Sequence, residues 1–228
     1  MTEVKQIRIA DSDMRIVLPG TWVRVPLDSE EVAVAFAKRL VKRQTGKADR
    51  LARARREAVQ ELVSSARDAV GIGVHTYLMS LEILPGIPFP AAMLLRDDEW
   101  PAESLPALQA GNIEEALTTG FPEVEVTEGV SGLIARRWEM VRQQVGEEEF
   151  MTMRLEYFLP YPDGAGLLMV RANMSNIPGG EPFATLFNEI VDSITFPAVV
   201  DEAADEAQGA VTVSPAVEVA QEPARNPA

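Results

Sequence analysis

Cysteine is absent from this 228-residue chain, and histidine occurs once, as His75. The lack of cysteine excludes disulfides, thiolate nucleophiles and cysteine-based metal sites, and a single histidine excludes a histidine cluster. Aromatic residues make up only 6% of the chain. No apolar run approaches the roughly 20 residues that a membrane-spanning helix needs. We therefore expect neither thiol chemistry nor a membrane span.

Positive charge is also scarce, with 21 Lys+Arg against 35 Asp+Glu and a net charge of −14. Such a balance repels polyanions, so a general nucleic-acid binder is not expected. The fractions of hydrophobic residues (46%) and charged residues (25%) are those of an ordinary globular protein. The polar residues Met1–Lys5 do not resemble a signal peptide, and we expect a cytoplasmic protein.

The end of the chain has a different composition. Residues 201–228 contain eight Ala, four Val, three Pro, six acidic residues, one Arg and no aromatic residue. Such a segment buries too little apolar surface to offset the lost backbone entropy. We expect residues 199–228 to be a disordered acidic tail, with a short interaction motif around Val211–Val219 as the alternative.

The rest of the chain, residues 4–198, has the alternating patterns of an α+β domain. A long helical stretch is expected at about residues 29–68, interrupted at Gly46, with Asp28 and Glu31 at the spacing of a capping box. Irregular chain is expected between Pro101 and Phe121, with one or two helical turns near Asn112–Leu117. Strands are predicted at Val4–Ile9, Met14–Leu18, Thr21–Val25, Ile72–Glu82, Ala91–Leu95, Glu123–Glu128, Leu133–Gln143, Glu149–Leu159 and Gly166–Met174.

The last helix has the clearest pattern. Its apolar residues recur at helical spacing and form one complete stripe, and Pro182 precedes them in the first turn, where its missing N–H costs nothing. The stripe consists of Phe183, Leu186, Phe187, Ile190, Val191 and Ile194. Burial of these side chains would make this helix a main anchor of the sheet.

Two stretches of the chain resemble the PsbP-like family, whose fold is shared with the Ran-binding Mog proteins. The first is Ile16-Val17-Leu18-Pro19-Gly20-Thr21-Trp22, which is similar to the strand, Leu-Pro-Gly and Trp opening of that family. The second is the end of the domain, where the last helix runs into Asp192-Ser193-Ile194-Thr195-Phe196. The resemblance covers residues 4–25 and 150–197, and the middle of the chain only by the order of its elements.

The resemblance implies an antiparallel sheet sandwiched by helices, in proteins that mostly bind other proteins rather than catalyse reactions. Members of the family include accessory subunits, lipoproteins of actinobacterial envelopes and chaperones that shelter transmembrane helices of secreted effectors. This chain differs from the envelope members because it has no recognisable signal peptide, and from the family in general because of its long helical stretch.

A basic cluster is the sharpest charge feature. Residues 38–56 hold nine basic residues against Asp49 alone, a net charge of +8. With the tail at −5, the rest of the −14 chain carries −17. The cluster indicates a solvated helix face, a docking surface for an acidic partner or, least of all, a nucleic-acid contact, because it has no interleaved aromatic residues. The candidate partner-binding residues are Arg39, Arg43, Lys47, Arg50 and Arg53.

A second candidate surface is the strand that carries Met151, Met153 and Tyr157 on one face. Methionine adapts its shape to irregular apolar surroundings. This face is expected either to pack against the last helix or to form an adaptable apolar groove for a partner helix or peptide.

No residue is expected to act in catalysis or to bind a cofactor or metal. The acidic runs Asp97-Asp98-Glu99 and Glu147-Glu148-Glu149 lack calcium-loop spacing and are expected to be solvated turns. His75 has no identifiable nucleophile near it in the sequence pattern and is expected to be a packed or surface residue.

The leading hypothesis is a non-enzymatic cytosolic protein that binds another protein, as an adaptor or a secretion-type chaperone. The partner would present an acidic surface or an apolar helix. The alternatives are a small-molecule or lipid-binding accessory domain that uses the sheet face as a pocket and, more weakly, a nucleic-acid-associated protein that uses residues 38–56. An open apolar groove would favour the first hypothesis, whereas an enclosed apolar pocket would favour the second.

Overall fold

The computed structural model describes residues 4–9, 13–46, 48–145, 148–175 and 180–197. The chain divides into two units, Met1–Pro197 and Ala198–Ala228, and all described residues belong to the first. The expected tail and the alternative motif at Val211–Val219 lie outside the described residues.

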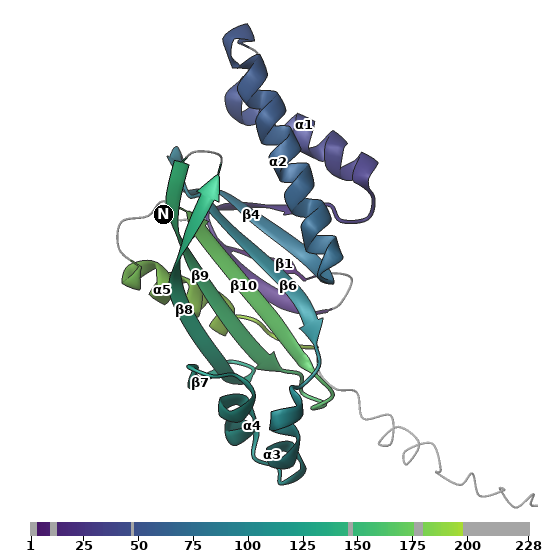
Figure 1. Ribbon diagram of the computed structural model, residues 1–228, viewed down its shortest axis with the longest axis vertical. Coiled ribbons are helices and arrows are strands. Elements are labelled where there is room, and N and C mark those ends of the chain that lie inside the picture. The colour runs from purple at the N-terminus through teal and green to yellow at the C-terminus, as the bar shows by residue number, and fades with distance from the viewer. Residues whose placement is uncertain (1–3, 10–12, 47, 146–147, 176–179, 198–228) are drawn as a thin grey trace, which may run out of the picture. The chain divides into compact units, whose positions relative to one another are not determined.

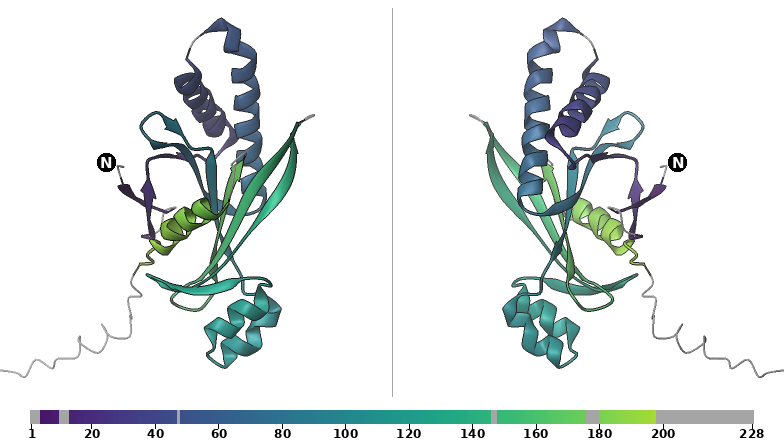
Figure 2. Two further views of the ribbon diagram at one scale, coloured as in Figure 1. Left: turned by 90° about the vertical axis from the view of Figure 1, so that its left-hand side faces the viewer. Right: turned by 90° about the vertical axis from the view of Figure 1, so that its right-hand side faces the viewer.

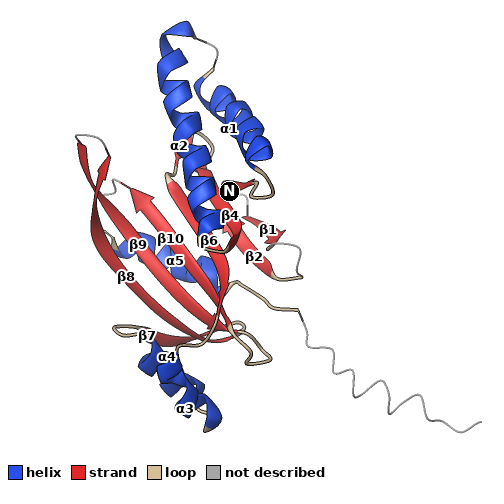
Figure 3. Ribbon diagram, turned by 45° about the vertical axis from the view of Figure 1, so that its right-hand side comes forward, coloured by secondary structure: helices blue, strands red, loops and turns tan. Residues whose placement is uncertain are grey.

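An antiparallel sheet is the framework of the described part of the chain (Figures 1 and 3). Its strands, in spatial order, are β3 (Thr21–Val25), β4 (Val74–Leu84), β6 (Ala91–Asp98), β10 (Leu167–Ser175), β9 (Glu148–Pro160), β8 (Gly132–Val145) and β7 (Glu125–Gly129). The two-residue β5 (Ile87–Pro88) pairs with β4, and β1 (Val4–Arg8) and β2 (Arg15–Pro19) form a separate hairpin. The predicted α+β class is confirmed, and each predicted strand corresponds to a strand of the structure.

The helices occur mostly where the apolar pattern predicts them. They are α1 (Glu30–Thr45), α2 (Ala52–Gly71), α3 (Leu105–Gln109), α4 (Ile113–Gly120) and α5 (Glu181–Asp192), with 3₁₀ turns at Asp49–Leu51 and Ala102–Ser104. The helical turns expected near Asn112–Leu117 correspond to α4, whereas α3 lies in a stretch that was expected to be irregular.

The start of α1 differs from the predicted capping box. Ser29, rather than Asp28, is the N-cap, and its hydroxyl accepts a hydrogen bond from the backbone N–H of Val32 at 3.3 Å. The helix begins at Glu30, and the cap must be the residue immediately before the first helical position.

The turn at Leu18-Pro19-Gly20 joins the two sheets. Gly20 has a φ of +78°, and a Cβ atom at this position would lie 2.2 Å from the carbonyl oxygen of Glu82 on β4. The indole of Trp22 donates a hydrogen bond to the carbonyl of Pro19 at 2.8 Å. Only glycine tolerates both a positive φ and so close an approach of the two backbones. This explains why Gly20 follows Leu18-Pro19 in this turn.

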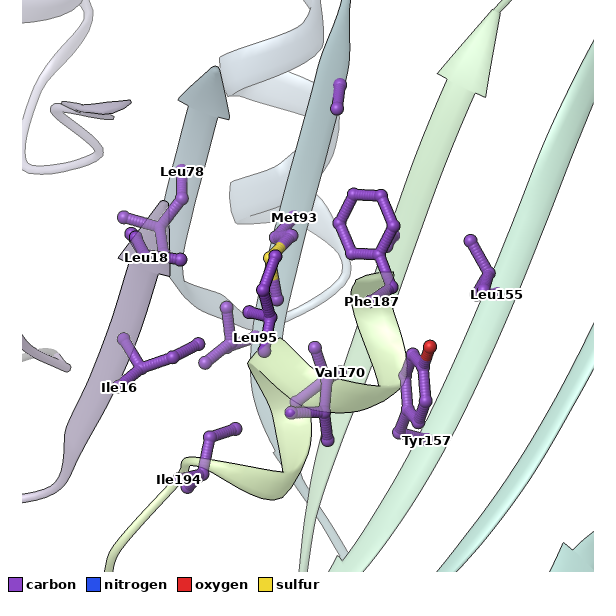
Figure 4. Close-up of a cluster of buried hydrophobic side chains, with 14 of the residues drawn as sticks. Ile16, Leu18, Leu78, Met93, Leu95, Leu155, Tyr157, Val170, Phe187 and Ile194 are labelled. Carbon is purple, nitrogen blue, oxygen red and sulfur yellow. The ribbon is translucent and has the colours of Figure 1, made fainter. Parts of the chain in front are cut away.

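The main core lies between α5 and one face of the sheet, which we call the α5 face. The side chains that β9 contributes to it are Met153, Leu155, Tyr157 and Leu159. Figure 4 shows Phe187 of α5 over this face, with Val170 of β10 and Tyr157 beside it. The β1–β2 hairpin extends the same core through Ile16 and Leu18.

The opposite face, which we call the α2 face, has two smaller apolar clusters at its ends. At one end α1 and α2 pack on β4 and β6 around Ala66, Ala69 and Tyr77. At the other end α4 packs on β8, β9 and β10 around Leu117 and Phe158. Polar side chains, among them Arg154, Glu156 and Arg171, lie between these clusters. This arrangement leaves the middle of the α2 face open to other molecules.

Candidate functional site

The basic residues lie at the far end of the α1–α2 hairpin, which we call the basic tip and define as the described residues of 38–56. Figure 2 shows this end of the two helices standing clear of the sheet. From Val41 to Ser65, none of the described residues is buried. The tip therefore contributes little to the core, and its charges are exposed to solvent.

A cleft of about 690 Å³ opens between α1 and α2 at the basic tip, and we call it the tip cleft. Its lining combines four cations with small and aliphatic side chains and one amide. The residues that line it are Lys38, Val41, Lys42, Gly46, Ala52, Arg55, Arg56, Val59 and Gln60. Arg55 holds the linker between the helices, because its guanidinium donates to the carbonyls of Gly46 (3.1 Å) and Ala48 (2.9 Å).

Four of the basic residues predicted from the sequence to bind a partner lie in the basic tip but not in the lining of this cleft. Arg39, Arg43 and Arg50 are exposed, and Arg53 forms an ion pair with Glu57 at 2.7 Å. Lys47 lies outside the described residues. Sequence reasoning missed Lys38, Lys42, Arg55 and Arg56 as a group, although the i, i+4 spacing of Lys38 and Lys42 was a usable signal.

A second surface is the free edge of β8. The pairing of β7 with β8 ends at Arg136, opposite Glu125. From Arg137 onward, β8 pairs with β9 on one side, and none of the described residues forms a strand on its other side. The backbone groups along that side are therefore available to pair with another strand.

Large apolar side chains are exposed beside this edge. Trp138 is 49% exposed, Met140 is 37% exposed and Met151 is 40% exposed. Trp138 lies opposite Leu155, and Met140 lies opposite Met153, which places both on the α5 face of the sheet. Met151 precedes Met153 by two residues and shares that face. We call these three residues the edge patch.

The structure places two of the three predicted Met/Tyr residues in the core. Met153 and Tyr157 are buried under α5, and the hydroxyl of Tyr157 lies 3.0 Å from the side-chain amide of Asn188. Neither side chain reaches the surface, because the helix covers this part of the sheet. Only Met151 is placed to contact a partner.

A groove of about 630 Å³ crosses the α2 face, between α2 and the hairpin formed by β8 and β9. It is open to solvent, and its lining is mixed in polarity rather than apolar. The lining residues are Glu61, Ser65, Tyr77, Met79, Ser80, Pro90, Ala91, Ala92, Val141, Arg142, Thr152, Arg154, Asn173 and Ser175. The groove reaches β8 at Val141 and Arg142.

Glu156 is the most enclosed charged group on the α2 face. One carboxylate oxygen accepts from Arg137 at 2.6 Å, and the other accepts from Arg171 at 2.7 Å. Burial acts to raise the pKa of Glu156, but the two guanidinium groups outweigh it, and the pKa lies below its ordinary value. Both oxygens are occupied by these two partners, so the arrangement ties three strands together rather than offering a reactive carboxylate.

His75, near the start of β4, belongs to a small polar cluster with Asp97, near the end of β6. Its Nε2 atom lies 3.3 Å from Asp97, and the hydroxyl of Tyr161 hydrogen-bonds the same carboxylate. Burial is the main cause that lowers the pKa of His75, although Asp97 opposes it, and burial also raises the pKa of Tyr161. At neutral pH the histidine is therefore neutral and the tyrosine protonated.

The acidic run that begins at Asp97 differs from the expected solvated turn. Asp97 and Asp98 belong to the end of β6, where Asp98 pairs with Arg96 at 2.8 Å. Of the second run, Glu147 lies outside the described residues. Within the part of the chain that the structure describes, no group of three or more His, Asp or Glu side chains is arranged to hold a metal ion. Among the helices described, none is long and apolar enough to cross a membrane.

Comparisons with known proteins add no relative. No protein-family model matches the chain, and no curated protein matches its sequence. Its function has to be inferred from the surfaces described above.

Proposed function

We propose that the chain is a cytosolic, non-enzymatic protein-binding protein, an adaptor or a secretion-type chaperone, that holds an extended segment of its partner along the free edge of β8. The observation that carries this proposal is the coincidence of a strand edge without a partner strand among the described residues, Arg137–Val141, with the exposed edge patch of Trp138, Met140 and Met151.

An unpaired edge offers a row of backbone donors and acceptors to an incoming strand. A peptide that pairs with β8 would gain main-chain hydrogen bonds along Arg137–Val141. Its side chains would alternate between the two faces of the sheet, so that every second one lies beside Trp138 and Met140. Main-chain pairing would supply affinity, and the side chains on the α5 face would supply selectivity.

The composition of the edge patch suits partners of varied sequence. Tryptophan offers a large apolar surface that also has a hydrogen-bond donor, and methionine adapts to side chains of different shape. Exposed aromatic and methionine side chains next to an open edge invite aggregation unless they serve an interaction. This combination therefore favours a binding role for the edge.

The alternative functions have weaker support. The groove on the α2 face is open and mixed in polarity, whereas pockets for small molecules or lipids are concave and mainly apolar. The resemblance to the PsbP-like family, whose members mostly bind proteins, supports the same conclusion.

The test is capture of partners by the edge itself. A photo-reactive phenylalanine analogue replaces Glu139, an exposed residue of the free edge, and the full chain is irradiated in a lysate of the source organism. We expect a defined crosslinked partner, identified by mass spectrometry. The double variant Trp138→Lys/Met140→Lys should weaken binding of that purified partner about tenfold or more, equal to about 1.4 kcal/mol.

The matched control makes the same chemical change at two exposed apolar residues away from the free edge, Ile87→Lys/Val130→Lys. Both variants add two positive charges, and both should retain the wild-type circular dichroism spectrum and melting temperature. Equal weakening by the two variants, or crosslinks from Glu139 to no defined partner, would contradict binding at the edge.

A further inference from the structure

We infer that the tip cleft between α1 and α2 is a second docking site, which binds an acidic amphipathic helix of a protein partner. This inference does not depend on the edge of β8, because it rests on different residues at the far end of the helical hairpin.

The lining of the cleft is complementary to an acidic amphipathic helix in both charge and hydrophobicity. Val41, Ala52 and Val59 supply an apolar surface, and Lys38, Lys42 and Arg56 supply positive charge around it. An amphipathic helix places apolar residues at positions i, i+3, i+4 and i+7 and carboxylates on the flanks of that stripe. It could bury its apolar stripe against the valines while its carboxylates reach the cations, as in other grooves that bind helices.

The cations of the cleft are available to a ligand. Within the part of the chain that the structure describes, no carboxylate lies in ion-pair distance of Lys38, Lys42 or Arg56. The pairs at this end of the hairpin join Arg53 to Glu57 and, farther down, Arg67 to Glu30. Concentrated like charges repel one another, and no part of the core requires them here, which favours a role in binding.

The observations favour an acidic protein segment over nucleic acid. Residues 38–56 contain no aromatic side chain on which a base could stack, and the uncharged part of the cleft lining is mainly aliphatic. Outside the basic segment and the tail, the chain carries −17. A long polyanion would meet this repulsion as it extends beyond the tip, whereas a single acidic helix ends within the local positive patch.

The experiment compares two charge-reversal variants of the full chain that change the net charge equally. The cleft variant is Lys38→Glu/Lys42→Glu/Arg56→Glu, and the outer variant is Arg39→Glu/Arg43→Glu/Arg50→Glu. Arg55 is retained in both because it holds the linker, and Arg53 is retained because it pairs with Glu57. A third variant, Val59→Thr, replaces an aliphatic side chain of the cleft lining with a polar one of nearly the same volume.

The probes are fluorescein-labelled peptides of about 18 residues, long enough for several helical turns. One has leucine at helical spacing and glutamate elsewhere, and the other has the same composition with the leucines out of phase. A random DNA duplex of about 20 base pairs is the third probe, and fluorescence anisotropy is measured at about 150 mM salt.

We expect the wild type to bind the amphipathic peptide at least about tenfold more tightly than the scrambled peptide and the duplex. The cleft variant should lose about tenfold or more in affinity for that peptide, Val59→Thr should lose about threefold, and the outer variant less than about twofold. Equal losses in the cleft and outer variants would overturn the inference in favour of undirected charge attraction. Tighter binding of the duplex, or no binding of the amphipathic peptide, would also overturn it.

Discussion

Phe187 is the side chain through which α5 is fixed to the rest of the core. It is fully buried, its ring stacks on Phe89 at a centroid distance of 6.2 Å, and it meets the edge of Trp22 at 6.4 Å. These two partners come from the segment before β6 and from β3, so one residue of the last helix joins segments that are distant in sequence. Its loss would leave a cavity that no single neighbour can fill.

We predict that Phe187→Ala lowers the free energy of unfolding by about 3–5 kcal/mol, through lost transfer energy and the cavity left behind. Urea unfolding followed by tryptophan fluorescence measures this change. Thr185→Ala, an exposed residue of the same helix, serves as the control and should change little. A cost below about 1 kcal/mol for Phe187→Ala would mean that α5 does not pack as the structure shows.

Glu156 illustrates a buried charge that is retained because both of its oxygens are paired. Its two arginine partners come from the neighbouring strands β8 and β10, so the carboxylate crosslinks three strands on the α2 face. Because the pKa of Glu156 is lowered in the folded chain, ionised Glu156 stabilises the fold above the pKa of the unfolded chain. That contribution is lost as the pH falls through the folded value.

We predict that Glu156→Gln lowers the free energy of unfolding at pH 7 by about 1–3 kcal/mol, because two guanidinium groups lose their charged partner. The difference from the wild type should shrink as the pH falls through the lowered pKa of Glu156 in the folded chain, where the wild-type carboxyl becomes protonated. Glu139→Gln is the matched control, since that exposed carboxylate pairs with Arg154 at 3.2 Å and should contribute little. A difference that stays constant with pH would contradict the role of the charge.

At the scale of elements, α1 and β8 both contain backbone groups that have no hydrogen-bond partner within their own helix or sheet. The first N–H groups of α1 have no partner within the helix, and the hydroxyl of Ser29 satisfies the one at Val32. The second half of β8 has β9 on one side only, and the described residues supply no strand on the other. At the start of α1 a side chain of the same chain accepts the hydrogen bond. Along β8 the described residues leave the outer edge available to a strand of a partner.

We predict that Ser29→Ala destabilises the protein by about 0.5–2 kcal/mol through loss of the N-cap, whereas Asp28→Ala costs clearly less. Thermal unfolding of the two variants, compared with the wild type, measures the difference. A larger effect at Asp28 would restore the capping box predicted from the Asp28 and Glu31 spacing.

At the scale of the whole molecule, the distribution of charge is the dominant feature. Residues 38–56 carry +8, the tail carries −5, and the rest of the chain carries −17. The tip cleft would bind its partner through the positive charge of the basic tip. The edge of β8 would bind mainly through apolar contacts and main-chain pairing. Binding at the tip should therefore weaken with added salt much more than binding at the edge.

We predict that a chain ending at Pro197 melts within about a degree or two of the full-length protein, since the composition of residues 198–228 offers little apolar area to bury. Differential scanning calorimetry of both chains provides the comparison. A drop of several degrees would show that the segment around Val211–Val219 contributes to the stability of the domain.

Much of the local structure was predictable from the sequence because it depends on local spacing. The stripe from Phe183 to Ile194 sets the buried side of α5, and the two-residue period from Met151 to Leu159 sets the alternation of β9. The boundaries were less predictable. Neither the cap at Ser29 nor the short helix α3 followed from periodicity, because both depend on contacts over only one or two turns.

The candidate sites show what sequence alone could not decide. The basic cluster at residues 38–56 was visible as composition, but its division into cleft-lining and outer cations depends on how α1 and α2 pack. Met151, Met153 and Tyr157 share one strand face, yet α5 covers only the last two.

The sequence by itself determined the α+β class, the order of the elements and the contrast between a basic segment and an acidic remainder. These follow from residue types and their spacing along the chain. The tertiary structure decided which strand edge is left unpaired, which cations converge and which apolar side chains remain exposed. Those properties depend on which segments meet in space, and the pairing of β8 with β7 over only Gly132–Arg136 is not encoded in any local pattern.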